Sequence, residues 1–548
     1  MPRAVATLLA GAAVAAAAGL AALPSESAGA ASTTTLQAIP ADSVVDSYGI
    51  GIHTNFLDTP YRDYGAVADA LAGLGVRHVR DDLYLDAPRQ YAAIKAVAQR
   101  AGVRFDLILG RPTDSATPAD YVDTVADQLS GGAVESLEGT NEWDLSGRSD
   151  WPSELLDWQE GLYRAARANP ATADLPLLSP ALAFRWNYPQ TDGLSSYADI
   201  ANAHVYPGGY VPSTEITKVL AALIDAVPEQ KTITTEAGYH NALNAQSSHP
   251  AVPEDVAAAY LPRLLLEHVS RGDSRMYSYE LIDEFDDPGL TNPEAHFGLL
   301  RHDLSPKPAY TTMQNLLALL DDPGTSFRPG SLPISVSGWP SDGKYLLTQR
   351  SDGSYVLLLW RDASLWDPGS QTRQTVTPAS VTLGFGSSYD VAVHHLDSAA
   401  PVATSTGSSV TVDLDAAVTA IELDPATTAT PTPTTPTATP TPTASTSPTT
   451  SASPTPTATT TPEVTTCPTA VVAKAARRHV TVRWQPAPDD GVTAYRLKIG
   501  GRTLLLGPDD TRAKVRGLPR GARVRATVTA RNAAGWGAAT RSAYVRLG

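Results

Sequence analysis

The sequence of 548 residues contains a single cysteine, Cys467. An intrachain disulfide is therefore excluded, and so is a metal site built from thiolates, because such sites need several cysteines. Cys467 could pair with a second chain, but an unpartnered thiol beside a linker is the simpler interpretation. After residue 30 the sequence also lacks an apolar run long enough to span a membrane.

Motifs of several other protein classes are missing. No Gly-x-Gly-x-x-Gly run follows the first candidate strand, which disfavours a doubly wound dinucleotide-binding sheet. Without His-Glu-x-x-His or Gly-x-Ser-x-Gly, a zinc protease and an α/β-hydrolase lack support. The acidic cluster Asp283, Glu284, Asp286 and Asp287 lacks EF-hand spacing, so a solvated loop is favoured over a calcium site. We expect no metal and no organic cofactor.

The net charge of −16 is unevenly divided along the chain. Residues 468–548 carry 16 Lys and Arg against 4 Asp and Glu, so this segment has a charge of +12 and the rest has −28. Strong acidity over most of the chain argues against nucleic acid as a partner and suits a neutral ligand. The basic segment suggests contact with an anionic cell-wall polymer, and a passive spacer is the alternative.

The two ends of the chain differ in composition from the middle. Residues 1–31 predict a cleaved secretory signal peptide, because Arg3 precedes an apolar run over 4–23 and then small residues. A retained membrane anchor is the lesser alternative. We therefore expect a secreted protein, with cell-wall association as a further possibility and no membrane span after cleavage. Residues 425–467 are almost entirely Pro, Thr, Ala and Ser, which predicts an extended linker.

The middle of the chain predicts a (β/α)₈ TIM barrel over residues 40–322. Eight β-prone segments alternate with eight helical patterns, which is the number that such a barrel requires. The candidate strands are 48–53, 77–81, 103–109, 134–138, 177–181, 199–204, 231–235 and 275–279, and the candidate helices are 62–73, 88–101, 117–130, 151–169, 192–198, 214–226, 253–272 and 308–320. Short alternating segments over 323–424 predict a β-sandwich that packs on the barrel.

Two glutamates share one kind of position. Glu142, in Asn141-Glu142-Trp143, follows the strand 134–138, and Glu236 follows the strand 231–235. Catalytic side chains of parallel barrels collect where strands end. Hydrolysis of a glycosidic bond needs two carboxyl groups, and a retaining enzyme needs them about 5–5.5 Å apart. The spacing alone leaves open which glutamate acts as the acid and which as the nucleophile.

The Asn141-Glu142 pair after the fourth strand and Glu236 after the seventh resemble the signature of clan A retaining glycoside hydrolases, and the sandwich resembles that of the family 39 group. This resemblance implies that Glu142 is the acid/base and Glu236 the nucleophile. It also implies sugar-binding roles for further residues: Asn141, Arg80, His53, Asn55, His204 and Tyr206. The clan's Trp after the eighth strand is missing, and Tyr279 or Glu280 stands in that region, which puts the substrate in doubt.

Other interpretations remain open at several positions. Trp143 and Trp186 could stack on sugar or belong to the core, and Arg80 could form a structural ion pair with Asp81 or Asp82. Residues 468–548 resemble a fibronectin type III module in Trp484, Tyr495, Leu518 and the hairpin at 532–537, with Val524 in place of the usual Tyr. The predicted function is hydrolysis of β-glycosidic bonds in a polysaccharide or oligosaccharide. The alternative is a non-catalytic carbohydrate-binding or adhesion protein.

Overall fold

The computed structural model of the chain describes residues 33–426, apart from 228–230, 248 and 325. It also describes 469–547, with gaps at 477–478, 487–491, 493, 501, 508–509, 517, 519–522, 533–534 and 543–544. The predicted signal peptide, Cys467 and nearly all of the predicted linker lie outside these residues. The chain forms two compact units that divide after Thr427. Within the described ranges, none of the helices combines the length and apolar character that a bilayer crossing requires.

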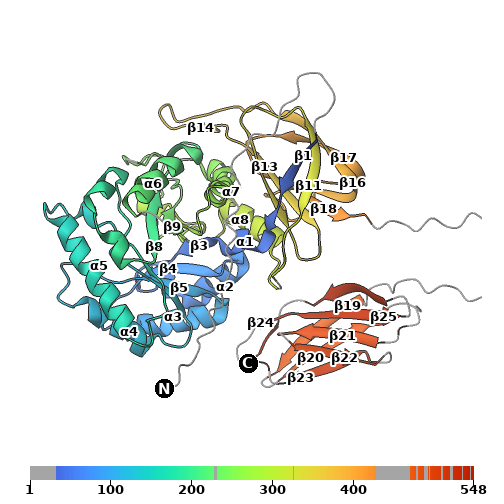
Figure 1. Ribbon diagram of the computed structural model, residues 1–548, viewed down its shortest axis with the longest axis horizontal. Coiled ribbons are helices and arrows are strands. Elements are labelled where there is room, and N and C mark those ends of the chain that lie inside the picture. The colour runs from blue at the N-terminus through green and yellow to red at the C-terminus, as the bar shows by residue number, and fades with distance from the viewer. Residues whose placement is uncertain are drawn as a thin grey trace, which may run out of the picture. The chain divides into compact units, whose positions relative to one another are not determined.

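Eight parallel strands close into a barrel in the first unit (Figure 1). They follow one another around the ring in chain order, and β10 closes it by pairing with β3. The predicted eight-stranded parallel barrel is confirmed, and every strand overlaps its predicted segment. The strands are β3 (Tyr48–Gly51), β4 (His78–Asp82), β5 (Arg104–Ile108), β6 (Val134–Glu138), β7 (Leu177–Leu178), β8 (Ile200–Val205), β9 (Lys231–Ala237) and β10 (Met276–Ser278).

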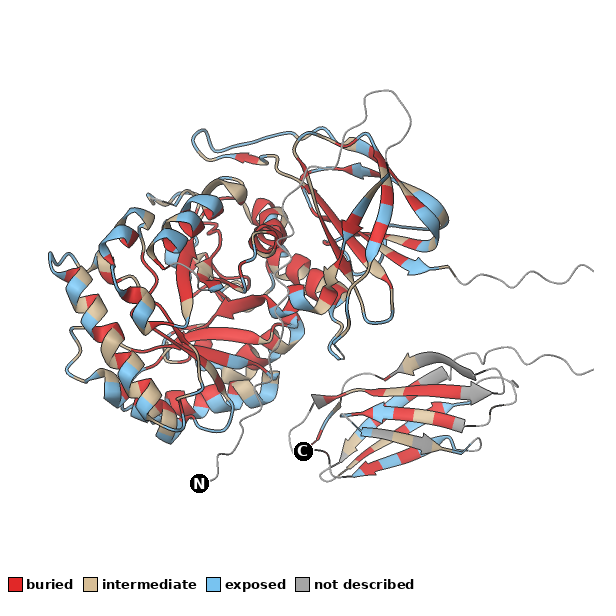
Figure 2. Ribbon diagram, in the orientation of Figure 1, coloured by how far each residue is buried: buried red, intermediate tan, exposed pale blue. Residues whose placement is uncertain are grey.

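Helices cover the outside of the barrel and turn their buried faces towards it (Figure 2). In α4, Thr117 and Asp120 form a capping box, Pro118 occupies the first turn, and Tyr121 and Val125 are buried. A short α1 (Ala41–Asp46) precedes β3. The described α-helices between and after the strands are α2 (Tyr64–Leu74), α3 (Pro88–Ala101), α4 (Pro118–Gln128), α5 (Trp151–Ala168), α6 (Ser213–Ala226), α7 (Glu254–Ser270) and α8 (Pro308–Leu320).

The connection from β7 to β8 differs from the prediction. The α-helix expected over 192–198 is a single 3₁₀ turn, η4 (Leu194–Tyr197), and another 3₁₀ segment, η3 (Arg185–Gln190), precedes it. Pro189 inside η3 lacks the backbone N–H that a helix needs, and Gly193 has a left-handed φ of 91°. These two residues break the segment, so a loop lies where the repeating pattern of the barrel predicts a helix.

The sandwich is a single eight-stranded sheet that folds over on itself. Its long strand β16 pairs with β11 through its first half and with β18 through its second, and the register shifts between Gly384 and Tyr389. The strands are β1 (Thr33–Gln37), β2 (Ile39–Pro40), β11 (Ser331–Ser337), β12 (Gly343–Gln349), β13 (Tyr355–Arg361), β16 (Ala379–His395), β17 (Ala403–Leu414) and β18 (Thr419–Pro425). The prediction did not place 33–40 in this sheet, although β1 pairs antiparallel with β11.

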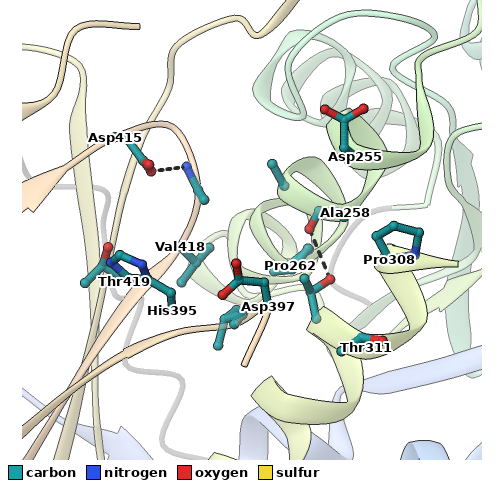
Figure 3. A pocket seen from close by; sticks show the side chains of 14 residues that line it. Asp255, Ala258, Pro262, Pro308, Thr311, His395, Asp397, Asp415, Val418 and Thr419 are labelled. Carbon is teal, nitrogen blue, oxygen red and sulfur yellow. Dashed lines mark hydrogen bonds between the residues drawn. The ribbon is translucent and has the colours of Figure 1, made fainter. Parts of the chain in front are cut away.

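Polar and ionic contacts join the sandwich to the barrel helix α7. Glu267 is buried and accepts hydrogen bonds from Lys344 Nζ at 2.7 Å and Trp360 Nε1 at 3.1 Å. Arg263, also buried, donates to the carbonyl of Ala363 at 3.0 Å. Beside these contacts is a cavity of about 460 Å³ between α7, α8 and the sandwich (Figure 3). None of the residues considered for catalysis lines it.

The second unit contains a three-stranded and a four-stranded antiparallel sheet. The first has the order β19–β20–β23 and the second β22–β21–β25–β26. Trp484 and Tyr495 are buried in its core with ring centroids 5.5 Å apart. The strands are β19 (Thr469–Ala476), β20 (His479–Gln485), β21 (Ala494–Ile499), β22 (Arg502–Leu506), β23 (Arg512–Arg516), β25 (Ala526–Asn532) and β26 (Gly535–Arg541), with a separate pair of β24 (Arg523–Val524) and β27 (Val545–Arg546).

Candidate active site

Glu142 and Glu236 lie close together at the C-terminal end of the barrel. Glu142 follows β6, and Glu236 is the penultimate residue of β9. A carboxylate oxygen of each and a ring nitrogen of His204 all lie within 4.8 Å of one another. Two strands that are far apart in the sequence therefore bring two carboxyl groups to one point.

The backbone around Glu142 is tightly constrained. Gly139 follows β6, and a Cβ atom there would lie 2.4 Å from Gln159 Oε1 and 2.8 Å from the Pro180 nitrogen. Only glycine permits this close approach. Glu142 itself has a left-handed φ of 44°, and its N–H donates to the Ala181 carbonyl at 3.1 Å. Non-glycine residues adopt this conformation mainly where the surroundings impose it, and it is common at functional sites.

Arg80, on β4, joins the two glutamate-bearing strands. Its Nη1 atom donates to Glu236 at 2.6 Å, and its Nη2 atom donates to Asn141 Oδ1 at 2.7 Å. Its Nε and Nη2 atoms donate to the two oxygens of Glu138 at 2.8 and 2.7 Å. Arg80 is buried and pairs with Glu138 and Glu236, not with its neighbours Asp81 or Asp82. The alternative of a local ion pair is therefore wrong.

His204 and Tyr206 come from the end of β8 and bind the same carboxylates. His204 Nδ1 lies 2.7 Å from Glu142 Oε1 and 3.5 Å from Glu236 Oε2, and the Tyr206 hydroxyl donates to Glu236 Oε2 at 2.7 Å. Burial acts to raise the pKa of Glu236, but the charges of His204 and Arg80 outweigh it and leave that pKa below its ordinary value. Burial acts to lower the pKa of His204, but Glu236 and Glu142 raise it. Glu236 is therefore held as a carboxylate.

A second pair of carboxyl groups lies beneath Arg80 inside the barrel. Glu138 and Asp106 are fully buried, and Asp106 accepts a hydrogen bond from Ser136 Oγ at 2.6 Å. Burial and the nearby charge of Glu138 raise the pKa of Asp106 well above its ordinary value. Burial opposes ionisation of Glu138, but Arg80 lowers its pKa overall. The pair therefore holds one proton on Asp106 and one negative charge on Glu138.

The carboxylates open into a cleft of about 680 Å³. Asn141, Glu142, His204, Tyr206, Glu236 and Tyr279 line it, together with residues that were not singled out from the sequence, which include Phe184, Tyr210, His249, Glu294 and Phe297. The loops after β6, β7, β8, β9 and β10 supply these walls. A cleft of this size is within the range of small-molecule binding sites.

At the β10 side of the barrel mouth, buried acidic residues gather around His53. Glu280 is fully buried, lies 3.3 Å from His53 Nε2 and accepts a hydrogen bond from the Tyr61 hydroxyl at 2.8 Å. Burial acts to lower the pKa of His53, but Glu280 and the nearby aspartates raise it to about 9. Burial, followed by the charge of Glu280, raises the pKa of Glu284 to about 7. Tyr279 lines the cleft, its ring lies 5.8 Å from that of His53, and its hydroxyl donates to Glu294 at 3.1 Å.

Some residues predicted to bind sugar do not lie on the wall of the cleft. Trp143 is buried, and its Nε1 atom donates to Glu154 at 3.2 Å, so its ring belongs to the core around α5. His53, Asn55 and Glu280 also do not line the cleft. Trp186, by contrast, lines it and is 62% exposed. Arg80 lies beneath the site and contacts its carboxylates from below.

Two groups of side chains have the donor types that bind a divalent cation. In the described residues these are His53, Glu280 and Glu284, and Glu142, His204 and Glu236. The second group coincides with the carboxylate pair itself. The acidic cluster considered for calcium is divided in the structure, because Asp283 pairs with Lys307 at 2.8 Å and Asp287 accepts from the backbone of Thr291 and Asn292.

Glu138 and Asp106 were missed in the sequence, although Glu138 carried a usable signal. Side chains two residues apart in a strand lie on the same face, so Ser136 and Glu138 point to the same side of β6 as polar neighbours. A polar pair in a strand of a parallel barrel is unusual, since such strands are mostly apolar. Phe297 and Glu294 have no comparable signal, because they lie in the connection after β10, outside the strand pattern.

No family model matches the sequence, and no curated protein matches it either. The structure resembles solved structures at low sequence identity. A family 39 glycoside hydrolase from Bacteroides cellulosilyticus WH2 aligns with a TM-score of 0.50 and 16% identity, over 71% of this chain and 82% of the other. A monomeric β-xylosidase from Caulobacter crescentus CB15 aligns with a TM-score of 0.49 and 15% identity, over 71% and 98%. At these identities the likeness describes the shared barrel fold.

Proposed function

We propose that this protein is an exported retaining glycoside hydrolase that cleaves β-glycosidic bonds of a polysaccharide or oligosaccharide. The observation that carries the proposal is the short distance between Glu142 and Glu236, at most 4.8 Å between an oxygen of each. Retaining enzymes place their carboxyl groups about 5–5.5 Å apart, whereas inverting enzymes need about 6.5–9.5 Å to admit a water molecule. The family 39 hydrolase with the same fold is consistent with this chemistry.

In the first step Glu236 attacks the anomeric carbon while Glu142 gives its proton to the departing glycosidic oxygen. The contacts support these roles. Arg80 and Tyr206 donate to Glu236 at 2.6 and 2.7 Å. Burial acts to raise the pKa of Glu236, but the charges of His204 and Arg80 and these hydrogen bonds lower it. Glu142 has no arginine partner among the described contacts, and its nearest partner is His204. The C1–O bond to the leaving group breaks, and an ester forms between C1 and Glu236.

In the second step Glu142 takes a proton from water, and the resulting hydroxide attacks C1. The ester bond to Glu236 breaks, which restores the carboxylate, and the sugar leaves with its original anomeric configuration. Arg80 and Tyr206 donate hydrogen bonds to the Glu236 carboxylate before it attacks and again after the ester is hydrolysed. They therefore stabilise its negative charge at the start and at the end of the cycle. His204 Nδ1 lies 2.7 Å from Glu142 Oε1 and fixes the position of that carboxyl group in both steps.

The test uses 4-nitrophenyl β-glycosides of xylose, glucose, galactose and mannose. Glu236→Ala should reduce hydrolysis on the order of 10⁴-fold or more, and added azide should restore turnover and give the α-glycosyl azide. Glu142→Ala with azide should give the β-glycosyl azide, because the ester to Glu236 still forms. Glu160→Ala, which removes a carboxylate from the outer helix α5, is the matched control. If the wild-type protein binds these sugars without turnover, the carbohydrate-binding alternative is correct.

The second unit is proposed to be a fibronectin type III module that contacts an anionic wall polymer. Its three- and four-stranded sheets and the packing of Trp484 against Tyr495 support the module assignment. Along β23 the buried Ala513 and Val515 alternate with exposed basic residues: Arg512, Lys514 and Arg516. Arg483, also exposed, lies directly opposite Arg512 on β20. Like charges placed opposite one another destabilise a sheet, so an anionic partner is favoured on this face.

Two measurements test these assignments. The full chain should bind dextran sulfate beads but not uncharged dextran beads, and salt should release it, because exposed charges are screened. Replacing Arg512, Lys514 and Arg516 together by Gln should weaken this binding, and salt-insensitive binding would exclude an electrostatic contact. For export, the amino terminus of protein recovered from the culture medium should lie near residue 31. A protein that keeps residues 1–31 would contradict cleavage of the signal peptide.

A further inference from the structure

Large apolar side chains that solvent reaches gather along one part of the cleft wall. Trp186 is 62% exposed, Leu145 55%, Tyr210 51% and Phe184 37%, and all four line the cleft. The other exposed large apolar side chains of the barrel do not line the cleft and are Leu57, Tyr84, Ile224 and Phe285. Exposed aromatic rings in a concave surface indicate a ligand site, because leaving them in water costs free energy that only a ligand can recover.

Phe184 and Trp186 form a stacked pair. Their ring centroids are 4.8 Å apart and the ring planes are inclined by only 13°. The guanidinium of Arg185 lies 5.5 Å from the centre of the Trp186 ring. The pair belongs to the irregular connection between β7 and β8, where the regular barrel helix is missing. This connection therefore supplies a flat apolar surface with a polar group beside it, which suits the face and the hydroxyl edge of a sugar ring.

The same connection is fixed to the turn that carries Glu142. Asp144 accepts hydrogen bonds from the backbone N–H groups of Ala183 and Phe184 at 3.0 and 3.1 Å, and from Asn187 Nδ2 at 2.9 Å. Because Asp144 is two residues from Glu142, the aromatic pair has a defined position relative to that carboxyl group. A ligand resting on Phe184 and Trp186 is therefore placed beside Glu142.

The order of strands in the barrel indicates which side of the site faces the sugar that is attacked and which side faces the leaving group. β7, which precedes the aromatic pair, is a neighbour of β6, the strand before Glu142. β10, which precedes Tyr279 and Glu280, is a neighbour of β9, the strand that carries Glu236. Glu294, which follows β10 and lines the cleft, can accept a hydrogen bond from a hydroxyl group of the sugar that Glu236 attacks. The aromatic pair lies on the side of the residue that protonates the leaving group.

We propose that Phe184 and Trp186 form a subsite for the leaving group, and that this subsite takes a sugar ring or an aromatic aglycone. The inference rests on the proposed glycoside hydrolysis and names its second binding position. The same surface holds an acceptor sugar after the first step. Its hydroxyl group then competes with water: the C1–O bond to Glu236 breaks, a C1–O bond to the acceptor forms, and the acceptor proton passes to Glu142.

The experiment compares two leaving groups on one sugar. The wild-type protein is assayed with β-glycosyl fluorides of xylose, glucose, galactose and mannose, and with the β-1,4-linked disaccharide of each sugar that it cleaves. Fluoride is too small to reach the aromatic pair. Covering about 60 Å² of ring surface is worth roughly tenfold in affinity. Trp186→Ala should therefore lower kcat/KM about tenfold for the disaccharide and leave the fluoride unchanged, and Trp186→Tyr should restore most of the loss.

Product analysis supplies an independent measurement. With the fluoride as donor and a high concentration of the free sugar as acceptor, Trp186→Ala and Phe184→Ala should lower the ratio of transfer to hydrolysis. Ile224→Ala removes a half-exposed apolar side chain from the outer face of α6 and should change neither measurement. Equal losses on both substrates, or no loss on either, would overturn the subsite while hydrolysis stands. Absence of turnover on every fluoride and every aryl glycoside would overturn the proposed function and the subsite with it.

Discussion

His204 Nδ1 lies 2.7 Å from an oxygen of Glu142 and 3.5 Å from an oxygen of Glu236, so one imidazole contacts both candidate catalytic carboxyl groups. The ring is buried, and each carboxylate raises its pKa. A change of charge on either glutamate therefore alters the electrostatic environment of the other through this ring. Acid catalysis and nucleophilic attack require the two glutamates to differ in protonation, and a shared imidazole is one contact through which each can influence the other.

The first prediction concerns the pH profile of His204→Gln. Burial alone raises the pKa of Glu236, and the positive charge of His204 is one of the two that lower it. Removing that charge should move the acid limb of the kcat/KM profile to higher pH. Tyr206→Phe removes a hydrogen bond but no charge, so it should move the limb less and in the same direction. An unchanged acid limb in His204→Gln would show that this ring does not hold Glu236 ionised.

The second prediction concerns Arg80 and Glu138. Arg80→Met leaves the buried Glu138 without its arginine partner, and breaking a buried ion pair costs about 3–5 kcal/mol. The free energy of unfolding in urea should fall by that amount. Adding Glu138→Gln removes the uncompensated charge and should recover much of the loss. Equal stability of the single and double variants would contradict a net charge on Glu138.

Arg80→Lys tests the geometry of the same contact. Lysine keeps the positive charge but cannot donate at once to Glu138, Asn141 and Glu236. The protein should remain folded while kcat falls, because the nucleophile loses its fixed position. A normal kcat in Arg80→Lys would show that charge alone is sufficient at this position.

The third prediction concerns the proton on Asp106. Because the pKa of Asp106 is raised in the folded protein, the folded state binds this proton more tightly than the unfolded chain does. Its contribution to stability is present below the ordinary aspartate pKa and is lost as pH rises through the folded value. Asp106→Asn mimics the protonated acid and keeps a donor towards Glu138. The variant should unfold at nearly the wild-type temperature in acid and should lose less stability than the wild type at alkaline pH.

The matched comparison for that prediction is Asp106→Leu. It has a similar volume but cannot donate to Glu138 or accept from Ser136, so it should be destabilised at every pH and should lose activity. If Asp106→Asn is as damaging as Asp106→Leu, the carboxyl group must be ionised in the folded protein, which would contradict a raised pKa for Asp106.

Periodicity predicted the barrel because its signal is repeated eight times. Each strand is followed by a helix or a loop of suitable length, and the ends of parallel strands meet at one rim, where the structure brings Glu142 and Glu236 together. The same reasoning failed at 192–198, where Pro189 and the left-handed Gly193 interrupt the chain. Such a break can be predicted only if a proline or a glycine in the segment is given more weight than the repeating strand–helix pattern.

The sequence could not predict contacts that depend on distant elements. The N-terminal strand β1 pairs with β11, almost 300 residues later, and nothing in its short pattern indicates that partner. Trp143 stands beside Glu142 in the chain, yet its ring turns away to reach Glu154. Trp186 has the same side chain and lies in the cleft. Packing on α5 orients Trp143, and the Asp144 contacts orient the segment that carries Trp186. Position in the sequence therefore predicted neither orientation.

The fourth prediction concerns the joint between α7 and the sandwich. Glu267 is buried and accepts from Lys344 and Trp360, whereas Asp255, on the same helix, pairs with Arg373 where both side chains are about 60% exposed. Glu267→Ala should lower the free energy of unfolding by about 3–5 kcal/mol, since it breaks a buried ion pair and leaves the buried Trp360 N–H without its acceptor. Asp255→Ala should cost less than about 1 kcal/mol, because exposed ion pairs are weak. Calorimetry should show the barrel and sandwich melting in one transition in the wild type. If Glu267→Ala leaves that transition unchanged, the buried contacts do not couple the two layers, and the sandwich is held by its apolar surface alone.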